Sequence, residues 1–544
     1  MDKKAHLIPT TFTAMPRGFH ASLITVEGSL TRGLPSFNLI GLADKTVTES
    51  RDRIRAAFLS SAFRFPNERI VINLAPAELP KNGAFFDLAI AVNIMVLSGQ
   101  LLLQDIEKRL FVGELALDGS LRPVPGIINI LEQAVKENFT EAFIPAGNQA
   151  QASLVARLPI RIYPVPSLRA LWSHLNRLNP LTPLFEHQTP LLPPAATTTQ
   201  LEDIHGQLRA KRALIISIAG RHNLLFFGPP GTGKTMLARA ALSLLPPPSL
   251  KEQIDITKIY SLATCDSLHP STLVIKQRPF RHPHHSASAN AILGGGALAL
   301  PGEVSLAHGG ILFFDELPEF SSGVLESLRE PLEDHFITIS RTANKNIYPA
   351  NFIFLAAMNP CPCGYLGSED HTCTCTPTAI ARYRKKLSGP LFDRIDLSLV
   401  IKPVPKTVLL KNTTAPDSAL TSLKARQLIQ KARRVAALRY GKSDFLNGDL
   451  SAKTLTNFVS LPSSSSAFLL KSAEQFCLSP RSVHKIIKLA LTIHDLNTAD
   501  SLPPNAKALE KTTTEKQAQE IHKTTLTVAD LAEALQYRDQ VFTV

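Results

Sequence analysis

The sequence predicts a multidomain α/β protein, and three observations support this fold class. Strand-like and helix-like segments alternate along residues 1–176. An apolar run, Leu224–Phe227, precedes a glycine-rich turn and a helix-like segment, Met236–Leu245. After residue 403 the chain becomes basic and helical in pattern. A length of 544 residues suits three or four domains, each large enough to bury its own core.

Composition and charge narrow the class of protein further. The formal net charge is +13 and the isoelectric point is near 9.4. A basic chain suits a polyanionic partner, but a basic surface kept for solubility fits the charge equally well. No apolar run approaches the ~20 residues of a membrane span, and no apolar signal core follows the amino-terminal lysines. We therefore expect no membrane segment and a cytoplasmic location.

Residues 1–176 are expected to form one domain of strands and helices. The predicted strands are Phe19–Val26, Phe37–Ile40 and Arg69–Leu74, and the predicted helices are Val47–Phe58 and a buried Phe86–Leu97. The first helix should expose Ser50, Arg51, Arg53 and Arg55. Its arginines are either nucleic-acid contacts or an ordinary solvated face. Five prolines then mark residues 177–199 as an extended linker.

Three stretches of this first domain carry a family resemblance. GLPSFNLIGLADKTVTESRDRIRAAF, INLAPAELPKNGAFFDLAIA and GELALDGSLRPVPG resemble the amino-terminal domain of the magnesium-chelatase-like ComM/YifB proteins. The resemblance implies the ribosomal-S5-like fold of the Lon protease domain. Lon-type proteases place a serine after P-K-x-G-x and a lysine in a later G-G-x-K, where this chain has Phe85 and Ile128. Neither side chain can attack a carbonyl or take a proton, so we expect no peptidase activity.

Residues 228–235 fit the pattern G-x-x-x-x-G-K-[ST] between a predicted strand and a predicted helix. In this pattern backbone N–H groups surround phosphate oxygens, Lys234 reaches the β- and γ-phosphates, and the Thr235 hydroxyl ligates Mg²⁺. The alternative is a chance glycine-rich turn, which the strand before and the helix after disfavour. The predicted nucleotide-binding residues are Gly228, Pro229, Pro230, Gly231, Thr232, Gly233, Lys234 and Thr235.

The stretch Gly310–Phe320, GILFFDELPEF, gives the acidic partner of that site. Four apolar residues form a predicted buried strand that ends in Asp315 and Glu316. Ligands of open α/β sheets bind beyond the carboxyl ends of the strands. We expect Asp315 to hold the Mg²⁺ that bridges phosphate oxygens, and Glu316 to position and polarise the attacking water. A surface turn is the alternative reading of the Asp-Glu pair.

The segments DELPEF, FLAAMNP and LFDRIDL resemble the AAA+ ATPases, in their magnesium-chelatase and MCM-like branch. The resemblance implies that Asn359 is sensor 1, that Arg394 is an arginine finger for a neighbour's ATP, and that Arg481 is sensor 2 of a helical lid. It also places residues 204–206 near the adenine. Structural salt bridges are the alternative for either arginine. A finger in trans requires a closed ring, and the family expectation is a hexamer.

Two insertions of this branch are recognisable in the chain. Residues 278–310 resemble the helix-2 insertion, with Gly294–Gly296 at its tip and the basic residues Arg278, Arg281, His282, His284 and His285. Histidines can bind metal, but no Cys or Glu is interleaved at ligand spacing, so we expect no metal there.

The second insertion is a predicted hairpin, Phe336–Ser340 with Ile347–Asn351, carrying Arg341 and Lys345 at its tip. The resemblance implies that both insertions face a central channel and track nucleic acid. The DNA-contact candidates are Arg281, Arg341 and Lys345, and a solvated turn lysine is the alternative for Lys345.

Four of the six cysteines lie close together in the stretch after Asn359. Cys361, Cys363, Cys373 and Cys375 make a C-x-C…C-x-C set, and four thiolates suit tetrahedral Zn²⁺. The single-residue spacers are tighter than the usual two to four residues. Structural zinc, an unoccupied thiol loop, and Fe–S or redox chemistry are the three alternatives.

The carboxyl-terminal region is expected to be a helical bundle. Predicted helices cover Leu423–Tyr440, which is basic, the region Leu478–Leu496, and Thr527–Tyr537 with Thr527 as N-cap. Residues 500–523 are expected to form an exposed segment.

These motifs follow the order of the ComM/YifB family along nearly the whole chain. The resemblance implies an S5/Lon-like domain without the catalytic dyad (1–176), a linker (177–199), an AAA+ core (200–402) and a helical lid (403–544). It further implies an ATP-driven hexameric DNA helicase or translocase for branch migration and heteroduplex extension of transforming DNA. The alternative is a protein-remodelling ATPase related to the magnesium-chelatase motor subunit. Expected cofactors are ATP and Mg²⁺, and expected partners are single-stranded or branched DNA and further copies of the chain.

Overall fold

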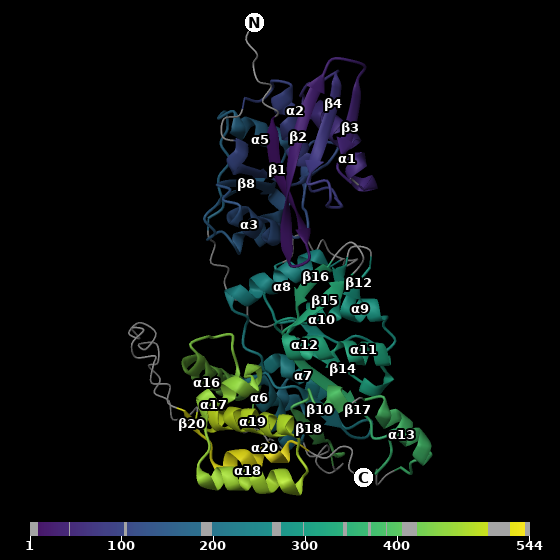
Figure 1. Ribbon diagram of the computed structural model, residues 1–544, viewed down its shortest axis with the longest axis vertical. Coiled ribbons are helices and arrows are strands. Elements are labelled where there is room, and N and C mark those ends of the chain that lie inside the picture. The colour runs from purple at the N-terminus through teal and green to yellow at the C-terminus, as the bar shows by residue number, and fades with distance from the viewer. Residues whose placement is uncertain are drawn as a thin grey trace.

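The computed structural model describes residues 9–42, 44–102, 106–185, 199–263, 274–296, 299–340, 345–367, 371–387, 389–404, 421–498 and 523–538. Most of the expected linker, Arg341, and nearly all of the segment 500–523 lie outside these ranges. The amino-terminal part forms one end of an elongated molecule, and the other two parts lie side by side at the opposite end (Figure 1).

The amino-terminal part is built on a seven-stranded sheet in the order β3-β4-β2-β1-β5-β8-β9. Its strands are β1 (Thr10–Arg17), β2 (His20–Thr31), β3 (Ser36–Ile40), β4 (Arg69–Ala75), β5 (Arg109–Phe111), β8 (Glu141–Pro145) and β9 (Arg161–Val165). Its other elements are α1 (Lys45–Ser60), α2 (Asp87–Leu97), β6 (Glu114–Leu115), β7 (Leu121–Arg122), α3 (Ile127–Lys136), α4 (Gln149–Ser153) and α5 (Leu168–Leu175). The expected strands and helices are confirmed. The likeness to the S5/Lon fold stays a prediction.

The apolar pattern of the sequence does not predict strand β1, because part of the buried face of this strand is polar. Thr11 and Thr13 are fully buried, and their hydroxyls donate to the carbonyl oxygens of Ala89 (3.0 Å) and Phe85 (3.4 Å). Buried hydroxyls are tolerated when they are hydrogen-bonded, and they hide the apolar alternation that identifies a strand.

The solvent-facing prediction for α1 is wrong for two of its four residues. Ser50 is buried, and the Arg53 guanidinium donates from Nε to Oδ2 of Asp87 at 2.8 Å. Asp87 is fully buried at the start of α2, so its carboxylate needs a charged partner. Arg51 and Arg55 are exposed as expected. Arg53 is therefore a structural residue of this part.

The central part is built on a five-stranded, fully parallel sheet in the order β11-β14-β17-β10-β18. The strands are β11 (Phe280–Arg281), β14 (Ile311–Phe314), β17 (Ile353–Met358), β10 (Leu224–Phe227) and β18 (Leu397–Val400). Alternate side chains of these strands enter two hydrophobic cores, one on each face of the sheet. Burial on both faces explains the unbroken apolar runs that predicted the strands.

Helices and short hairpins surround this sheet. They are α6 (Leu208–Gly220), α7 (Lys234–Leu244), α8 (Leu250–Leu262), α9 (Ala289–Leu293), β12 (Gly294–Gly295), β13 (Leu300–Pro301), α10 (Glu303–Leu306), α11 (Ser322–Ser327), α12 (Arg329–Asp334), β15 (Phe336–Ser340), β16 (Lys345–Pro349), α13 (Pro377–Lys385) and α14 (Gly389–Phe392). The predicted second hairpin is confirmed as β15–β16.

The carboxyl-terminal part is helical, as expected. Its elements are α16 (Ser422–Tyr440), α17 (Ala452–Phe458), β19 (Val459–Ser460), α18 (Ser463–Gln475), α19 (Pro480–Thr498), β20 (Thr524–Thr525) and α20 (Val528–Gln536). Thr527 caps α20 as predicted. One hydrophobic core runs from Leu201 to Tyr537, so these helices share it with one face of the parallel sheet. Among the described helices, none is long and apolar enough to cross a membrane.

Candidate nucleotide site and its surroundings

The backbone of residues 228–233 forms a tight loop between the carboxyl end of β10 and the first turn of α7. A Cβ atom at Gly228 would lie 2.3 Å from the carbonyl oxygen of Ile401, so only glycine fits there. Gly233 has φ of +86°, a left-handed conformation that favours glycine, and α7 begins at the next residue. The amides of a first helical turn lack helical partners and carry partial positive charge. The loop therefore presents N–H groups where an anion can bind.

The side chain of Lys234 is folded back onto this loop. Its ammonium donates to the carbonyl oxygens of Gly228 and Pro229, both at 2.7 Å, and to Oδ1 of Asn359 at 3.2 Å. Lys234 is only 8% exposed, and burial lowers its pKa to about 8, against the attraction of Asp315 and Glu316. The three donors are paired with neutral oxygens that a phosphate can displace.

Asp315 and Thr235 come together at the same edge of the sheet. Asp315 follows β14, and its Oδ2 accepts a hydrogen bond from the Thr235 hydroxyl at 2.7 Å. A carboxylate beside a hydroxyl is a pair of hard oxygen ligands, which fits Mg²⁺. The structure thus unites two residues that are 80 positions apart in the chain.

Glu316 has a neighbour that sequence reasoning missed. It adopts a left-handed conformation with φ of +51°, and its carboxylate lies 3.7 Å from Nδ1 of His285. The His282 ring packs on Phe313 of β14, with ring centroids 4.9 Å apart. His282 and His285 of the first insertion thus lie on the acidic side of the site. The sequence indicates the acidic strand end and the histidine-rich insertion separately, but no local pattern indicates that the two lie next to each other.

The segment 204–206 also lies at the loop-bearing edge. Gly206 faces Val404, just beyond the carboxyl end of β18, and Gln207 donates to the carbonyl oxygen of Lys402 at 2.8 Å. Its predicted place next to the nucleotide stays a prediction.

Arg394 and Arg481 lie near the amino-terminal ends of the parallel strands, opposite the end that carries the glycine-rich loop. Arg394 comes just before β18, whose Leu397 pairs with Leu224 at the start of β10. The glycine-rich loop of residues 228–233 follows the far end of β10, and four residues of strand span about 13 Å. Arg394 therefore cannot reach the loop of its own chain.

Both arginines contact one carboxylate, Glu333 of α12. Arg394 pairs with Glu333 through Nη2, and Nη2 of Arg481 lies 3.9 Å from the other carboxylate oxygen. Arg394 also donates to the carbonyl oxygens of Pro390 (2.8 Å) and Arg329 (3.2 Å). Glu333, Arg394 and Arg481 line a cavity of about 370 Å³.

The two insertions pack against each other. The Tyr348 hydroxyl and Asn346 Nδ2 of β16 both donate to the carbonyl oxygen of Ala299, next to β13, at 2.9 and 3.3 Å. Asn346 also touches the tip of the β1–β2 hairpin, since a Cβ at Gly18 would lie 3.0 Å from its Cβ. Lys345, which is exposed, and Arg17 border a cavity of about 450 Å³ at this junction.

The two arginines of the first insertion have acidic partners. Arg281 forms a two-point ion pair with Glu303, with both N–O distances at 2.5 Å. Arg278 is paired in the same way with Glu252, at 2.8 and 2.9 Å. Because both arginines are already paired with a carboxylate, each has less positive charge available to attract a phosphate.

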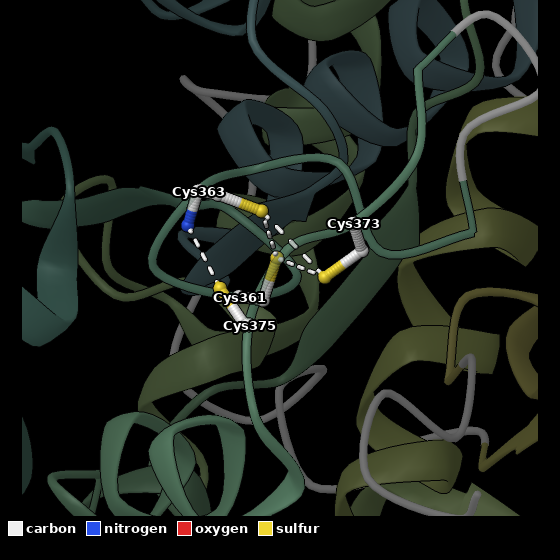
Figure 2. A group of neighbouring side chains, drawn as sticks. All are labelled: Cys361, Cys363, Cys373 and Cys375. Carbon is white, nitrogen blue, oxygen red and sulfur yellow. Dashed lines mark hydrogen bonds between the residues drawn. The ribbon is translucent and has the colours of Figure 1, made fainter.

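The four clustered cysteines converge on one point after β17. The Sγ atoms of Cys361 and Cys363 are 3.3 Å apart, and each lies 3.6 Å from Sγ of Cys373. Figure 2 shows the sulfur of Cys375 beside the other three sulfur atoms. The backbone amide of Cys363 donates a hydrogen bond to this sulfur at 3.4 Å. All four sulfur atoms lie within 4.8 Å of one another.

Comparisons with known proteins agree with this architecture. The family model "Magnesium chelatase, subunit ChlI" matches residues 200–409, "Subunit ChlI of Mg-chelatase" matches 26–148, and "Magnesium chelatase, subunit ChlI C-terminal" matches 419–511. Competence protein ComM of Haemophilus influenzae is 42% identical, over 90% of this chain and 95% of its own. YifB of Salmonella typhimurium and YifB of Escherichia coli are each 40% identical, over 89% of this chain and 92% of their own. With such identity along nearly the whole of each relative, the chain belongs to the ComM/YifB family of magnesium-chelatase-like AAA+ proteins.

Proposed function

We propose that this chain hydrolyses ATP in sites shared between neighbouring copies and uses the energy to move along DNA. One observation carries the shared site. The phosphate-binding loop, Asp315 and Asn359 lie at one edge of the parallel sheet, and Arg394 lies at the other. A second copy that presents its arginine edge to the first copy's loop edge completes the site. Such a head-to-tail contact closes into a ring, and we propose six copies.

The proposed roles follow from the contacts of each side chain. Lys234 exchanges its carbonyl partners for the β- and γ-phosphates. Thr235 and Asp315 would hold Mg²⁺, which would neutralise phosphate charge. Glu316 orients the attacking water and accepts its proton. Asn359, already bonded to Lys234, senses the γ-phosphate.

The arginines act from the neighbouring copy. Arg394 stabilises charge in the transition state once it leaves Glu333. Arg481 contacts the same carboxylate, which supports an action from the same edge and on the same neighbour.

Three observations support DNA as the polymer along which the chain moves. The chain carries a net charge of +13, and Lys345 and Arg17 border one cavity between the β1–β2 and β15–β16 hairpins. A relative that is 42% identical is named a competence protein. A ring of such tips is a positive channel that binds the backbone of single strands with little base preference. We propose branch migration of recombining DNA as the outcome, with no peptidase activity, since Phe85 and Ile128 are buried core residues.

The second candidate is the remodelling of a partner protein. It is favoured by the three family models, which all describe a magnesium-chelatase subunit.

The test combines ATP hydrolysis with a branch-migration assay on a labelled four-way junction. The DNA motor requires that DNA stimulates ATP hydrolysis and that the junction is resolved only with ATP. Lys234→Ala and Glu316→Gln should both abolish resolution. Hydrolysis that DNA leaves unchanged, with no junction movement, would favour protein remodelling.

A further inference from the structure

The loop between β17 and α13 carries a cysteine cluster that the proposed hydrolysis and DNA contacts leave unused. Within the described residues, this cluster alone brings three or more Cys, His, Asp or Glu ligand atoms together as a candidate metal site. It lies directly after Asn359, and its other end is fixed by Thr376, the N-cap of α13.

The sulfur positions match a tetrahedral ion. A Zn–S bond of about 2.3 Å requires neighbouring sulfurs about 3.8 Å apart in a regular tetrahedron. The Sγ–Sγ distances among Cys361, Cys363 and Cys373, at 3.3, 3.6 and 3.6 Å, lie close to that edge length. Four thiolates around one point suit a single soft ion better than a cluster, whose irons take separate thiolates.

The loop geometry places the two Cys-x-Cys arms face to face. Gly364 has φ of +86°, and its amide donates to the carbonyl oxygen of Cys361 at 3.0 Å, which closes a tight turn after the first arm. The Cys363 amide donates to Sγ of Cys375 at 3.4 Å and ties the first arm to the second. Cys361 is fully buried and the other three are half-buried, so a bound ion is shielded but reachable from solvent.

The cluster also touches the proposed nucleotide site. A Cβ on Gly364 would lie 2.8 Å from Cδ of Pro230 in the phosphate-binding loop and 3.9 Å from Cγ of Asn359. Asn359 in turn accepts from Lys234 at 3.2 Å. A rigid cluster at this position fixes the end of β17 and one wall of the loop together.

We infer that Cys361, Cys363, Cys373 and Cys375 bind one Zn²⁺, and that this zinc loop positions Asn359 against the phosphate-binding loop. Zinc supplies no redox step; it replaces up to four thiol protons and cross-links the two arms. The second half of the inference rests on the proposed role of Asn359, whereas the metal content of the protein does not.

Metal analysis of the full chain, purified without chelator, tests the first half. We expect about one zinc per chain. Cys373→Ser should lose it, whereas the matched control Cys477→Ser, an exposed cysteine outside the cluster, should keep it. Replacement of zinc by Co²⁺ in the unmutated chain should give the visible bands of tetrahedral cobalt thiolate, a readout that needs no variant. Less than one-fifth zinc per chain, about the same in both variants, with no cobalt bands, or stoichiometric iron instead, would overturn the assignment.

A double-mutant cycle tests the second half. Cys373→Ser should lower kcat for ATP hydrolysis by about 10- to 100-fold and change KM less, because it disturbs a positioning group. If zinc acts through Asn359, then adding Asn359→Ala to Cys373→Ser should cost little more than either change alone. If instead the factors by which the two single changes lower kcat multiply in the double variant, the zinc loop does not act through Asn359, even if the zinc itself is present.

Discussion

Burial lowers the pKa of Lys234 to about 8, so the affinity of this chain for Mg·ATP should fall as the pH rises from 7 to 9. The ammonium is held by two carbonyl oxygens and an amide oxygen, none of which carries a charge. Bound phosphates add negative charge and raise the pKa of Lys234 in the complex. The chain with protonated Lys234 therefore binds Mg·ATP more tightly. The contribution of this ammonium group to the affinity is fully present well below pH 8 and is lost as the pH rises above 8.

The size of the effect follows from the titration. With a pKa of about 8, the ammonium fraction falls from about nine-tenths at pH 7 to about one-tenth at pH 9. The affinity should fall about tenfold over that interval, or ~1.4 kcal/mol.

The assay is the equilibrium binding of a non-hydrolysable fluorescent ATP analogue, with Mg²⁺ in excess and ionic strength fixed. Lys234→Arg is the control, because arginine stays charged throughout this range. Its affinity should be lower at pH 7 but nearly independent of pH. A wild-type profile as flat as that of Lys234→Arg would refute the reasoning.

Three further predictions address separate parts of the chain. Arg53→Ala should destabilise the amino-terminal part by about 3–5 kcal/mol, because Asp87 is left buried without its partner. Urea unfolding followed by Trp172, the only tryptophan, should show this, with Arg51→Ala unchanged; equally small effects would contradict the structural role of Arg53. Lys345→Glu should weaken single-stranded DNA binding and flatten its salt dependence without changing ATP affinity. Lys442→Glu, an exposed lysine of the helical part, is the control, and equal losses would deny the hairpin a specific role. Glu316→Gln should bind Mg·ATP normally but hydrolyse it about 10²- to 10⁴-fold more slowly; a wild-type rate would exclude Glu316 as the base.

Local patterns predicted the parts of the site that are local in the chain. The glycine-rich loop, the Asp315 strand end and the Cys-x-Cys arms each occupy a few consecutive residues, and buried parallel strands give unbroken apolar runs. The resemblance added Asn359, Arg394 and Arg481, which carry no spacing signal of their own.

What the sequence could not supply are the partners across long separations. Arg53 sits at a solvent-facing helical position by period, but Asp87, 34 residues later, draws it into an ion pair. Arg394 meets Glu333 at a distance of 61 residues, and the pairing follows only from the assembled sheet edge. A charged residue shows its role only once its counter-charge is located.

The most direct test of the shared ATP site is a mixture of two inactive variants. Lys234→Ala removes the loop lysine and Arg394→Ala removes the arginine of the opposite edge, so each variant alone should lack ATP hydrolysis. In rings formed from equal amounts, about one interface in four joins an intact loop to an intact arginine, and activity should return to about a quarter of wild type. Mixtures that stay inactive, or Arg394→Ala rings that hydrolyse ATP at the wild-type rate, would contradict the shared site.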